Sequence, residues 1–190
     1  KAISGTGHIR KTEASLTLDT SKGMAHPVFD LKFLAGSALP DFLPDLKDVP
    51  MVGDFVLEDL RCDPRAHAVS GTGKVRKTEA TLTLDTSKGG ARPVFDLKFL
   101  AGSALPDVIP ELEDAPVLGN FVLEDLHYDP RAKSISGTGK VRKTEAVLTL
   151  DTSNGLKKPV FGLKIASGIT LPDVLPQLSG VPVVGDVSFD

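Results

Sequence analysis

The chain has 190 residues, a formal net charge of −3 and an apolar fraction of 41%, which is typical of a folded protein without a polyanion-binding field. Its apolar runs are too short to cross a bilayer, and its single cysteine excludes a disulfide framework within the chain. Aromatic residues make up only 5% and tryptophan is absent, which weighs against stacking platforms for bases or sugars. We therefore expect neither a nucleic-acid partner nor a membrane span.

A tandem repeat of 66 residues dominates the sequence. Residues 3–68 match residues 69–134 at 48 of 66 positions without a gap, and residues 135–190 match the second copy at 33 of 56. This unit is longer than a propeller blade or a helical hairpin repeat, so each copy must hold several elements. We predict three domains, which are repeat 1 (1–68), repeat 2 (69–134) and repeat 3 (135–190, without the final Asp-Pro-Arg-Ala connection).

Strand-like alternation recurs along each copy. In chain order, the second copy shows it in Asp54–Leu60, Ala80–Asp85 and Pro93–Leu100, and His67–Val75 is a glycine-containing strand between the first two. The short segments between them, "DPRA", "RKTE" and "TSKGG", have turn composition. Four strands joined by short turns predict an antiparallel meander.

A proline-rich segment, Ser103–Gly119, follows each meander. Ser103 and Asp107 are candidate N-caps for short helical turns, and Pro110 excludes a long helix. Val108, Ile109 and Leu112 form its apolar stripe. The predicted fold class is therefore mainly β with short helical inserts, and each repeat is a four-strand meander plus a short proline-containing helix. We expect the repeats to stack as an array or to close with pseudo-threefold symmetry.

The segment "SGTGKV" (Ser70–Val75) invites comparison with a phosphate-binding loop. It lacks the first glycine and the hydroxyl residue of that motif, and the pattern predicts a strand after it instead of a helix. In the first copy the lysine is replaced by His8. We interpret the glycines as sheet glycines at a bulge or a close backbone approach.

Other candidate catalytic and metal-binding residues also have structural explanations. Each of the four histidines aligns with Lys or Arg in another copy, which indicates solvated positions. Cys62 aligns with Tyr128, as expected for an apolar filler. The "LDTS" aspartates are expected in turns. Calcium at these turns is a less favoured alternative, because calcium-loop spacing is absent. We predict no catalytic, cofactor or metal site and no enzymatic activity.

Two strand segments occur at the ends of the chain without the connection that joins them inside the repeats, Lys1–Gly7 and Asp186–Asp190. Unpaired strand edges favour association. Three alternatives stay open: the two edges pair and close a ring, they pair between chains head to tail, or flanking repeats of a longer array cover them. The predicted assembly edges are Ala2, Ile3, Ser4, Gly5, Val187, Ser188 and Phe189.

We therefore expect a non-enzymatic structural protein, extracellular or at the cell surface, that assembles head to tail through its terminal strands as a filament, fibre or surface-layer-like component. Its expected partners are copies of itself or flanking repeats. One alternative is a ligand-binding module with an apolar groove for lipid. The segment "LPDVLPQL" (Leu171–Leu178) over a meander resembles AsmA-type lipid-transfer repeats in general texture only, so no family is inferred. The other alternative is a repetitive glycan-binding adhesin, which the scarcity of aromatic residues opposes.

Overall fold

The structure is a computed structural model that describes residues 1–9, 11–21, 23–47, 49, 51–87, 93–113, 118–155, 160–166, 169–170 and 188–189. The protein is mainly β, as predicted, and eleven antiparallel strands follow one another in the sheet in chain order. The strands are β1 (Ala2–Ile9), β2 (Thr12–Asp19), β3 (Val28–Ala38), β4 (Phe55–Asp63), β5 (Ala68–Val75), β6 (Thr78–Asp85), β7 (Val94–Ala104), β8 (Phe121–Asp129), β9 (Ser134–Val141), β10 (Thr144–Asp151), β11 (Val160–Ile165), β12 (Ile169–Thr170) and β13 (Ser188–Phe189).

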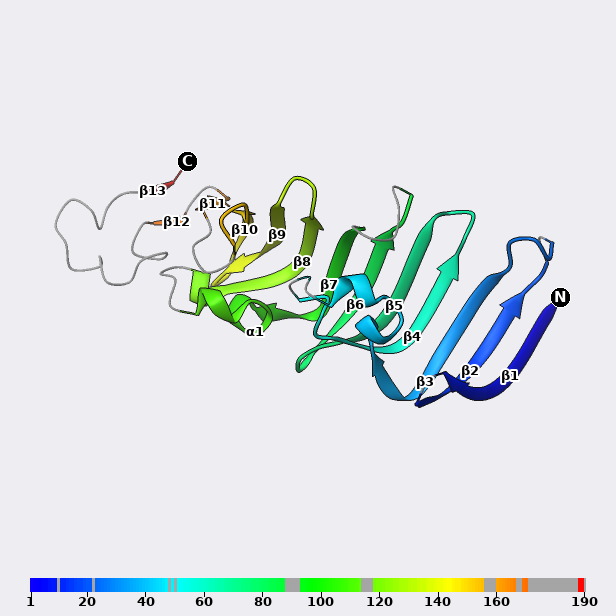
Figure 1. Cartoon of the computed structure of the whole chain (residues 1–190). Coiled ribbons are helices and arrows are strands. Elements are labelled where there is room, and N and C mark those ends of the chain that lie inside the picture. The colour runs from blue at the N-terminus through cyan, green and yellow to red at the C-terminus, as the bar shows by residue number, and fades with distance from the viewer. Residues whose placement is uncertain are drawn as a thin grey trace. The chain divides into compact units, whose positions relative to one another are not determined.

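The chain divides into two compact units, residues 1–100 with 129–131 and residues 101–128 with 132–190. In the first unit each strand from β1 to β7 is hydrogen-bonded to the next one in the chain (Figure 1). In the second unit β9, β10 and β11 pair in the same way, and β12 pairs with β13. The connections of β1 to β2, β4 to β5, β5 to β6 and β9 to β10 are short, as in the predicted antiparallel meander.

Alternation of apolar and polar residues sets the two faces of the strands. In β6, Ala80, Leu82 and Leu84 are buried, whereas Thr83 and Asp85 are exposed. In β7 the three alternating apolar residues Phe95, Leu97 and Phe99 are buried as well. Successive side chains of a strand point to opposite faces, so this pattern defines one apolar and one polar face. The alternation predicted for Ala80–Asp85 and Pro93–Leu100 is confirmed.

Two-residue turns close several hairpins. Val75 pairs with Thr78, so Arg76 and Lys77 alone connect β5 to β6. Arg76 has a φ of 55°, and Arg142, at the same place in the hairpin of β9 and β10, has a φ of 58°. Positive φ at the first loop residue matches the right-handed twist of the paired strands, although it favours glycine or asparagine over arginine.

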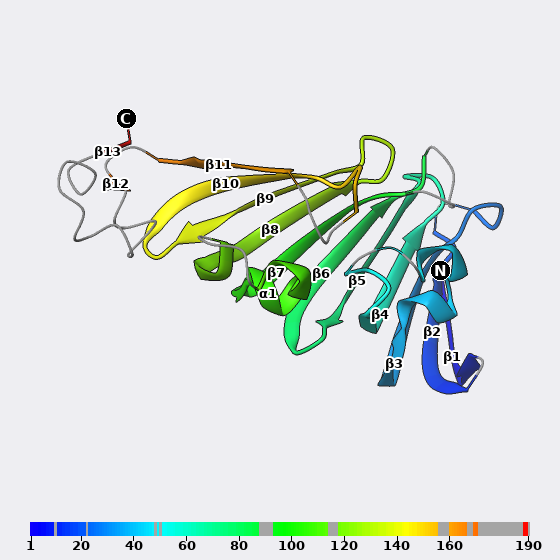
Figure 2. The same ribbon diagram turned by 60° about the vertical axis from the view of Figure 1, so that its left-hand side comes forward.

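Short helical turns in the proline-rich segments add to the apolar core. In the first unit these are η1 (Leu39–Asp41) and η2 (Pro44–Leu46), and they lie against one face of its strands (Figure 2). Leu39 and Leu46 are fully buried, and the ring of Phe42, directly after η1, lies 5.0 Å from that of Phe33 in β3. These contacts place the turns on the apolar face.

The second unit has three such turns, α1 (Leu105–Val108), η3 (Pro110–Leu112) and η4 (Leu118–Asn120). The predicted apolar stripe is confirmed because Val108, Ile109 and Leu112 are all buried. Pro110 begins a new turn after α1 ends, as expected from its missing N–H. The chain therefore forms separate single turns here instead of one helix.

The predicted N-caps of this segment are wrong. The N-cap of α1 is Ala104, which makes no side-chain capping hydrogen bond. Strand β7 continues to Ala104, so Ser103 is a strand residue with a buried side chain, and Asp107 lies inside the helical turn. The strand passes directly into the helix and leaves no loop position for a capping side chain.

Candidate functional site

The two glycines of β5 lie against the backbone of β4. A Cβ atom on Gly73 would be 2.1 Å from the carbonyl oxygen of Val56, and one on Gly71 would be 2.5 Å from that of Asp59. The pairing register of β4 and β5 shifts between Leu57 and Arg61, which places a bulge beside these glycines. Only glycine allows the two strands to approach this closely. The interpretation of "SGTG" as a close backbone approach at a bulge is confirmed.

The glycines of β9 have the same role in the second unit. A Cβ atom on Gly139 would be 2.1 Å from the carbonyl oxygen of Val122, and one on Gly137 would be 2.6 Å from a side-chain carbon of Leu123. Both neighbours belong to β8. The "SGTG" segment therefore receives a neighbouring "FVLED" strand in β5 and again in β9.

Strand β1 contains the same segment, but in the described part of the chain no strand follows its outer edge. A Cβ atom on Gly5 or Gly7 would meet nothing within 4 Å. Within the described residues, β1 pairs with β2 only. Among the described residues, no strand lies along the edge of β1 that corresponds to the edges of β5 and β9 that receive a strand, and this edge is the candidate functional site.

Apolar side chains next to this edge are exposed. Ile3 is 54% exposed, whereas Ile135 at the corresponding position of β9 is 1% exposed. Leu16 on β2 is 36% exposed, whereas Leu82 on β6 is 1% exposed. Exposed strand edges and large apolar side chains are both features that soluble proteins usually cover. The apolar face near β1 therefore lacks covering that its counterparts have.

Polar contacts accompany the occupied edges. The backbone N–H of Thr72 in β5 donates to Oδ1 of Asp59 in β4 at 3.0 Å, and its hydroxyl donates to Oδ2 at 2.5 Å. Nζ of Lys74 lies 3.4 Å from a carboxylate oxygen of Glu58, also in β4. The two acidic residues of "FVLED" therefore bind the threonine and the lysine of "SGTGK".

The corresponding lysine of the second unit makes the same ion pair. Nζ of Lys140 in β9 lies 2.7 Å from a carboxylate oxygen of Glu124 in β8. The hydrogen bond and the charge of Glu124 raise the pKa of Lys140. At the open edge of β1 these positions are occupied by Thr6 and His8, both exposed.

The sequence-predicted assembly residues have different surroundings. Ala2, Ile3, Ser4 and Gly5 are exposed residues of β1. Ser188 and Phe189 form β13 and pair with Thr170 and Ile169 of β12, so in the part of the chain described here they do not pair with β1. Val187 lies outside the described residues. Thr6, Gly7 and His8 continue the same strand and were not among the predicted assembly edges, although Thr6 and Gly7 lie in the predicted strand segment Lys1–Gly7.

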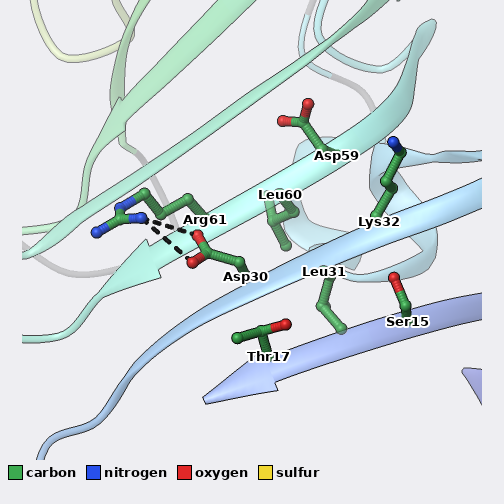
Figure 3. A pocket seen from close by; sticks show the side chains of 8 residues that line it. All are labelled: Ser15, Thr17, Asp30, Leu31, Lys32, Asp59, Leu60 and Arg61. Carbon is green, nitrogen blue, oxygen red and sulfur yellow. Dashed lines mark hydrogen bonds and ion pairs between the residues drawn. The ribbon is translucent and has the colours of Figure 1, made fainter. Parts of the chain in front are cut away.

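The polar face of the first unit has an open hollow of about 320 Å³. The side chains of β2, β3 and β4 that line it are shown in Figure 3. One guanidinium nitrogen of Arg61 lies 3.1 and 3.2 Å from the two carboxylate oxygens of Asp30. Its lining includes four charged residues, so this hollow differs from the apolar groove expected of a lipid carrier. The lining residues are Ser15, Thr17, Asp30, Leu31, Lys32, Asp59, Leu60 and Arg61.

The aspartates of the "LDTS" segments organise turns, as predicted. In all three copies, the backbone N–H two residues later donates to the aspartate at 2.8 Å. The following threonine donates its hydroxyl to a backbone carbonyl at the start of the neighbouring strand, also at 2.8 Å. Asp63 and Asp129 accept from the backbone N–H of Arg65 and Arg131 in the same manner. These carboxylates hold hairpin ends together.

The four histidines are exposed and Cys62 is half-buried. His8, His26, His67 and His127 are all exposed, as predicted. Burial raises the pKa of the Cys62 thiol, and the carboxylate of Asp63 raises it further. A raised pKa lowers the thiolate fraction, which favours the filler interpretation. Among the described residues, no group of three His, Cys, Asp or Glu side chains is placed to hold a metal ion.

Comparisons with known proteins identify no relative, so the functional conclusion is based on the geometry of the structure. No protein-family model matches the chain, and no curated protein or solved structure matches it significantly. None of the helices in the described ranges has the length and apolarity needed to cross a membrane. Within the described ranges, the outer edge of β1 differs from the corresponding edges of β5 and β9, which each receive a strand.

Proposed function

We propose that the protein is a non-enzymatic assembly protein whose 66-residue units join head to tail by β-strand pairing at the outer edge of β1. The observation that carries the proposal is the contrast between Gly7, which has open space beside it, and Gly73 and Gly139, which each receive a neighbouring backbone. Main-chain pairing at a free sheet edge is a common mode of protein association. In this proposal the assembly is a filament, a fibre or a surface layer at the cell surface.

The pairing of β13 supports a strand of another copy as the partner. Phe189 faces Ile169, and Ser188 faces Thr170. Two repeat lengths earlier in the sequence, Leu57 faces Ser37 and Val56 faces Ala38 in the pairing of β4 with β3. Strand β13 therefore corresponds to the start of β4, whose other edge receives β5. By the same correspondence, the other edge of β13 fits β1 of a second copy.

The size distribution of the 190-residue chain tests this proposal. We expect the mean mass from sedimentation velocity and light scattering to rise with concentration, and electron microscopy to show linear or layered particles. The variant Gly7→Val places branched carbons where an incoming carbonyl must lie, so we expect at least tenfold weaker association, on the order of 1.4 kcal/mol or more. Its fold should persist because no atom lies within 4 Å of the added Cβ.

A matched control distinguishes an effect at the edge of β1 from a general effect of a β-branched apolar residue on a strand. Thr83→Val also introduces a β-branched apolar residue, at an exposed position in the middle strand β6, and should associate like the parent chain. Compact monomers of the parent chain at all concentrations up to the millimolar range would contradict the proposal. Equal association of the Gly7→Val variant would place the interface elsewhere.

A further inference from the structure

Two rows of polar side chains surround the open hollow on the polar face of the first unit. The cross-strand register of β2, β3 and β4 sets these rows, and Figure 3 shows one toward each end of the hollow. None of the three is an edge strand, because β1 lies beside β2 and β5 lies beside β4. The volume of about 320 Å³ is at the lower end of the range for small-molecule sites. The rows consist of Thr17, Asp30 and Arg61, and of Ser15, Lys32 and Asp59.

Both carboxylates of the hollow are already bonded. The two oxygens of Asp30 lie 3.1 and 3.2 Å from one guanidinium nitrogen of Arg61. Asp59 accepts hydrogen bonds from the backbone N–H and the hydroxyl of Thr72, at 3.0 and 2.5 Å. Thr72 belongs to β5, so Asp59 is bonded to the strand on the far side of β4 from β3. A cation would have to displace these bonds, which disfavours a cationic ligand.

The bonding of Asp59 determines the state of Lys32. The two residues face each other in the register, but among the described residues Nζ of Lys32 makes no ion pair, because Asp59 bonds to Thr72 instead. Lys74 on β5 differs, since its Nζ lies 3.4 Å from a carboxylate oxygen of Glu58. The ammonium of Lys32 is therefore available to a ligand.

Two hydroxyl groups line the hollow on the neighbouring strand. Ser15 and Thr17 are half-buried on β2, and within the described ranges neither side chain has a hydrogen-bond partner. Half-buried hydroxyls are stabilised by hydrogen bonds, and each can both donate and accept. Ser15 faces Lys32 and Thr17 faces Asp30, so one hydroxyl belongs to each row. A ligand that extends across both rows can bond to both hydroxyls.

These groups fit a singly charged anion that carries hydroxyl groups. The ammonium of Lys32 favours an anionic group, whereas the carboxylates of Asp30 and Asp59 disfavour a second negative charge on the ligand. None of the residues that line the hollow is aromatic, so it has no platform for stacking a base or an aromatic ring. A hydroxylated monocarboxylate of the size of a sugar acid combines the required charge and hydroxyl groups.

We infer that the hollow over β2, β3 and β4 binds a small hydroxylated monocarboxylate. Lys32 holds the carboxylate, and Ser15 and Thr17 bond to the hydroxyl groups of the ligand. The inference goes beyond the proposed assembly and does not depend on it, because the site uses side chains on the polar face of interior strands and no unpaired backbone edge.

A titration of the full chain with sodium D-glucuronate tests the inference. Chemical-shift changes of ¹⁵N-labelled protein follow binding at about pH 7, where the carboxylate is ionised and the lysine is protonated. Sodium chloride keeps the ionic strength constant. We expect saturable changes at Ser15, Thr17, Lys32 and their neighbours, with a dissociation constant on the order of millimolar for an open site of this kind.

Two further probes separate the charge from the hydroxyl groups. Glucose has the hydroxyl groups of the ligand without its charge, and acetate has the charge without the hydroxyl groups. We expect each to bind at least about fivefold more weakly than glucuronate, because each loses one set of hydrogen bonds.

Matched variants isolate the side chains. Lys32→Gln should weaken glucuronate binding at least about fivefold, and Thr17→Val about threefold. Lys77→Gln removes the same charge at an exposed position in the turn between β5 and β6, outside the hollow, and should bind like the parent chain. Lys32 is exposed as well, and the same spectra report whether each variant stays folded.

Three results would overturn the inference. The first is the absence of saturable changes in the parent chain up to about 50 mM glucuronate, well above the expected dissociation constant. The second is equal binding of acetate and glucuronate, which would show that the ammonium attracts any anion. The third is an equal loss in Lys32→Gln and Lys77→Gln, which would show an effect of net charge and no site. The proposed assembly is measured separately, by the size distribution of the chain without glucuronate.

Discussion

The glycines of β1 and β5 belong to the same sequence segment, "SGTG", but differ in their surroundings. A methyl group on Gly73 meets the backbone of β4, whereas one on Gly7 meets nothing within 4 Å. Neither glycine has the positive φ that would require the residue for conformational reasons. The requirement for glycine at Gly73 therefore comes from the neighbouring strand alone.

Alanine substitutions measure this difference in stability. We expect Gly73→Ala to lower the free energy of unfolding by at least about 2 kcal/mol, because the backbone of β4 must move away from the added methyl group. Gly7→Ala should raise it by about 0.5 kcal/mol through the lower entropy of the unfolded chain. Urea unfolding at low protein concentration compares the two variants, and a similar loss in both would contradict the open edge.

The carboxylate of Asp151 makes the stability of the fold depend on pH. The backbone N–H and the side chain of Ser153 hydrogen-bond Asp151 and lower its pKa, and the charge of Lys133 lowers it further. A lowered pKa in the folded state means that the ionised carboxylate stabilises the fold above the unfolded-state pKa of about 3.9, and that this contribution is lost as the pH falls through the folded-state value.

The variant Asp151→Asn tests this direction of the pH dependence of stability. Asparagine keeps an oxygen acceptor for the N–H of Ser153 but has no charge. We expect the parent chain to be more stable than the variant at pH 7, and the difference to shrink as the pH falls through the folded-state pKa and the carboxylate becomes protonated. Urea midpoints of both proteins across this range provide the measurement. A constant difference at all pH values would show that the charge has no role.

At the level of elements, the proline-rich turns decide how the apolar face is covered. Leu39 of η1 is fully buried, whereas Leu34 of the preceding strand β3 is 72% exposed. We expect Leu39→Ala to cost about 2–5 kcal/mol of unfolding free energy, the range for leucines whose removal leaves a cavity. Leu34→Ala should change it by no more than about 0.5 kcal/mol. Thermal and urea unfolding compare this pair, and equal losses would contradict the packing of η1 on the sheet.

The strands were more predictable than these turns. Alternation in Ala80–Asp85 and Pro93–Leu100 indicated both the strands and their buried faces, because a period of two is a local property of the backbone. The N-cap of α1 was not predictable, because Ser103 and Asp107 are suitable capping residue types. Strand β7 extends to Ala104, which is therefore the residue at the N-cap of α1. The length of a strand depends on its pairing with other strands, which the local sequence does not specify.

At the level of the whole molecule, the open edge of β1 was only partly predictable. Comparison of the copies indicated that Ala2–Gly5 lacks its usual neighbour, and the structure shows these residues exposed. The sequence also indicated a close backbone approach at the glycines, but it did not indicate that Thr6 and His8 occupy the positions of residues that bind carboxylates. That correspondence became visible through the contacts of Thr72 and Lys74 with β4.

The amino-acid sequence determined the strands, their apolar faces and the turns at "DPRA" and "LDTS", because all of these follow from residues a few positions apart. The tertiary structure decided how closely the backbone of β4 approaches Gly71 and Gly73, and which side chains of β4 bind Thr72 and Lys74. These contacts join residues of two strands, so the alternation within one strand does not predict them.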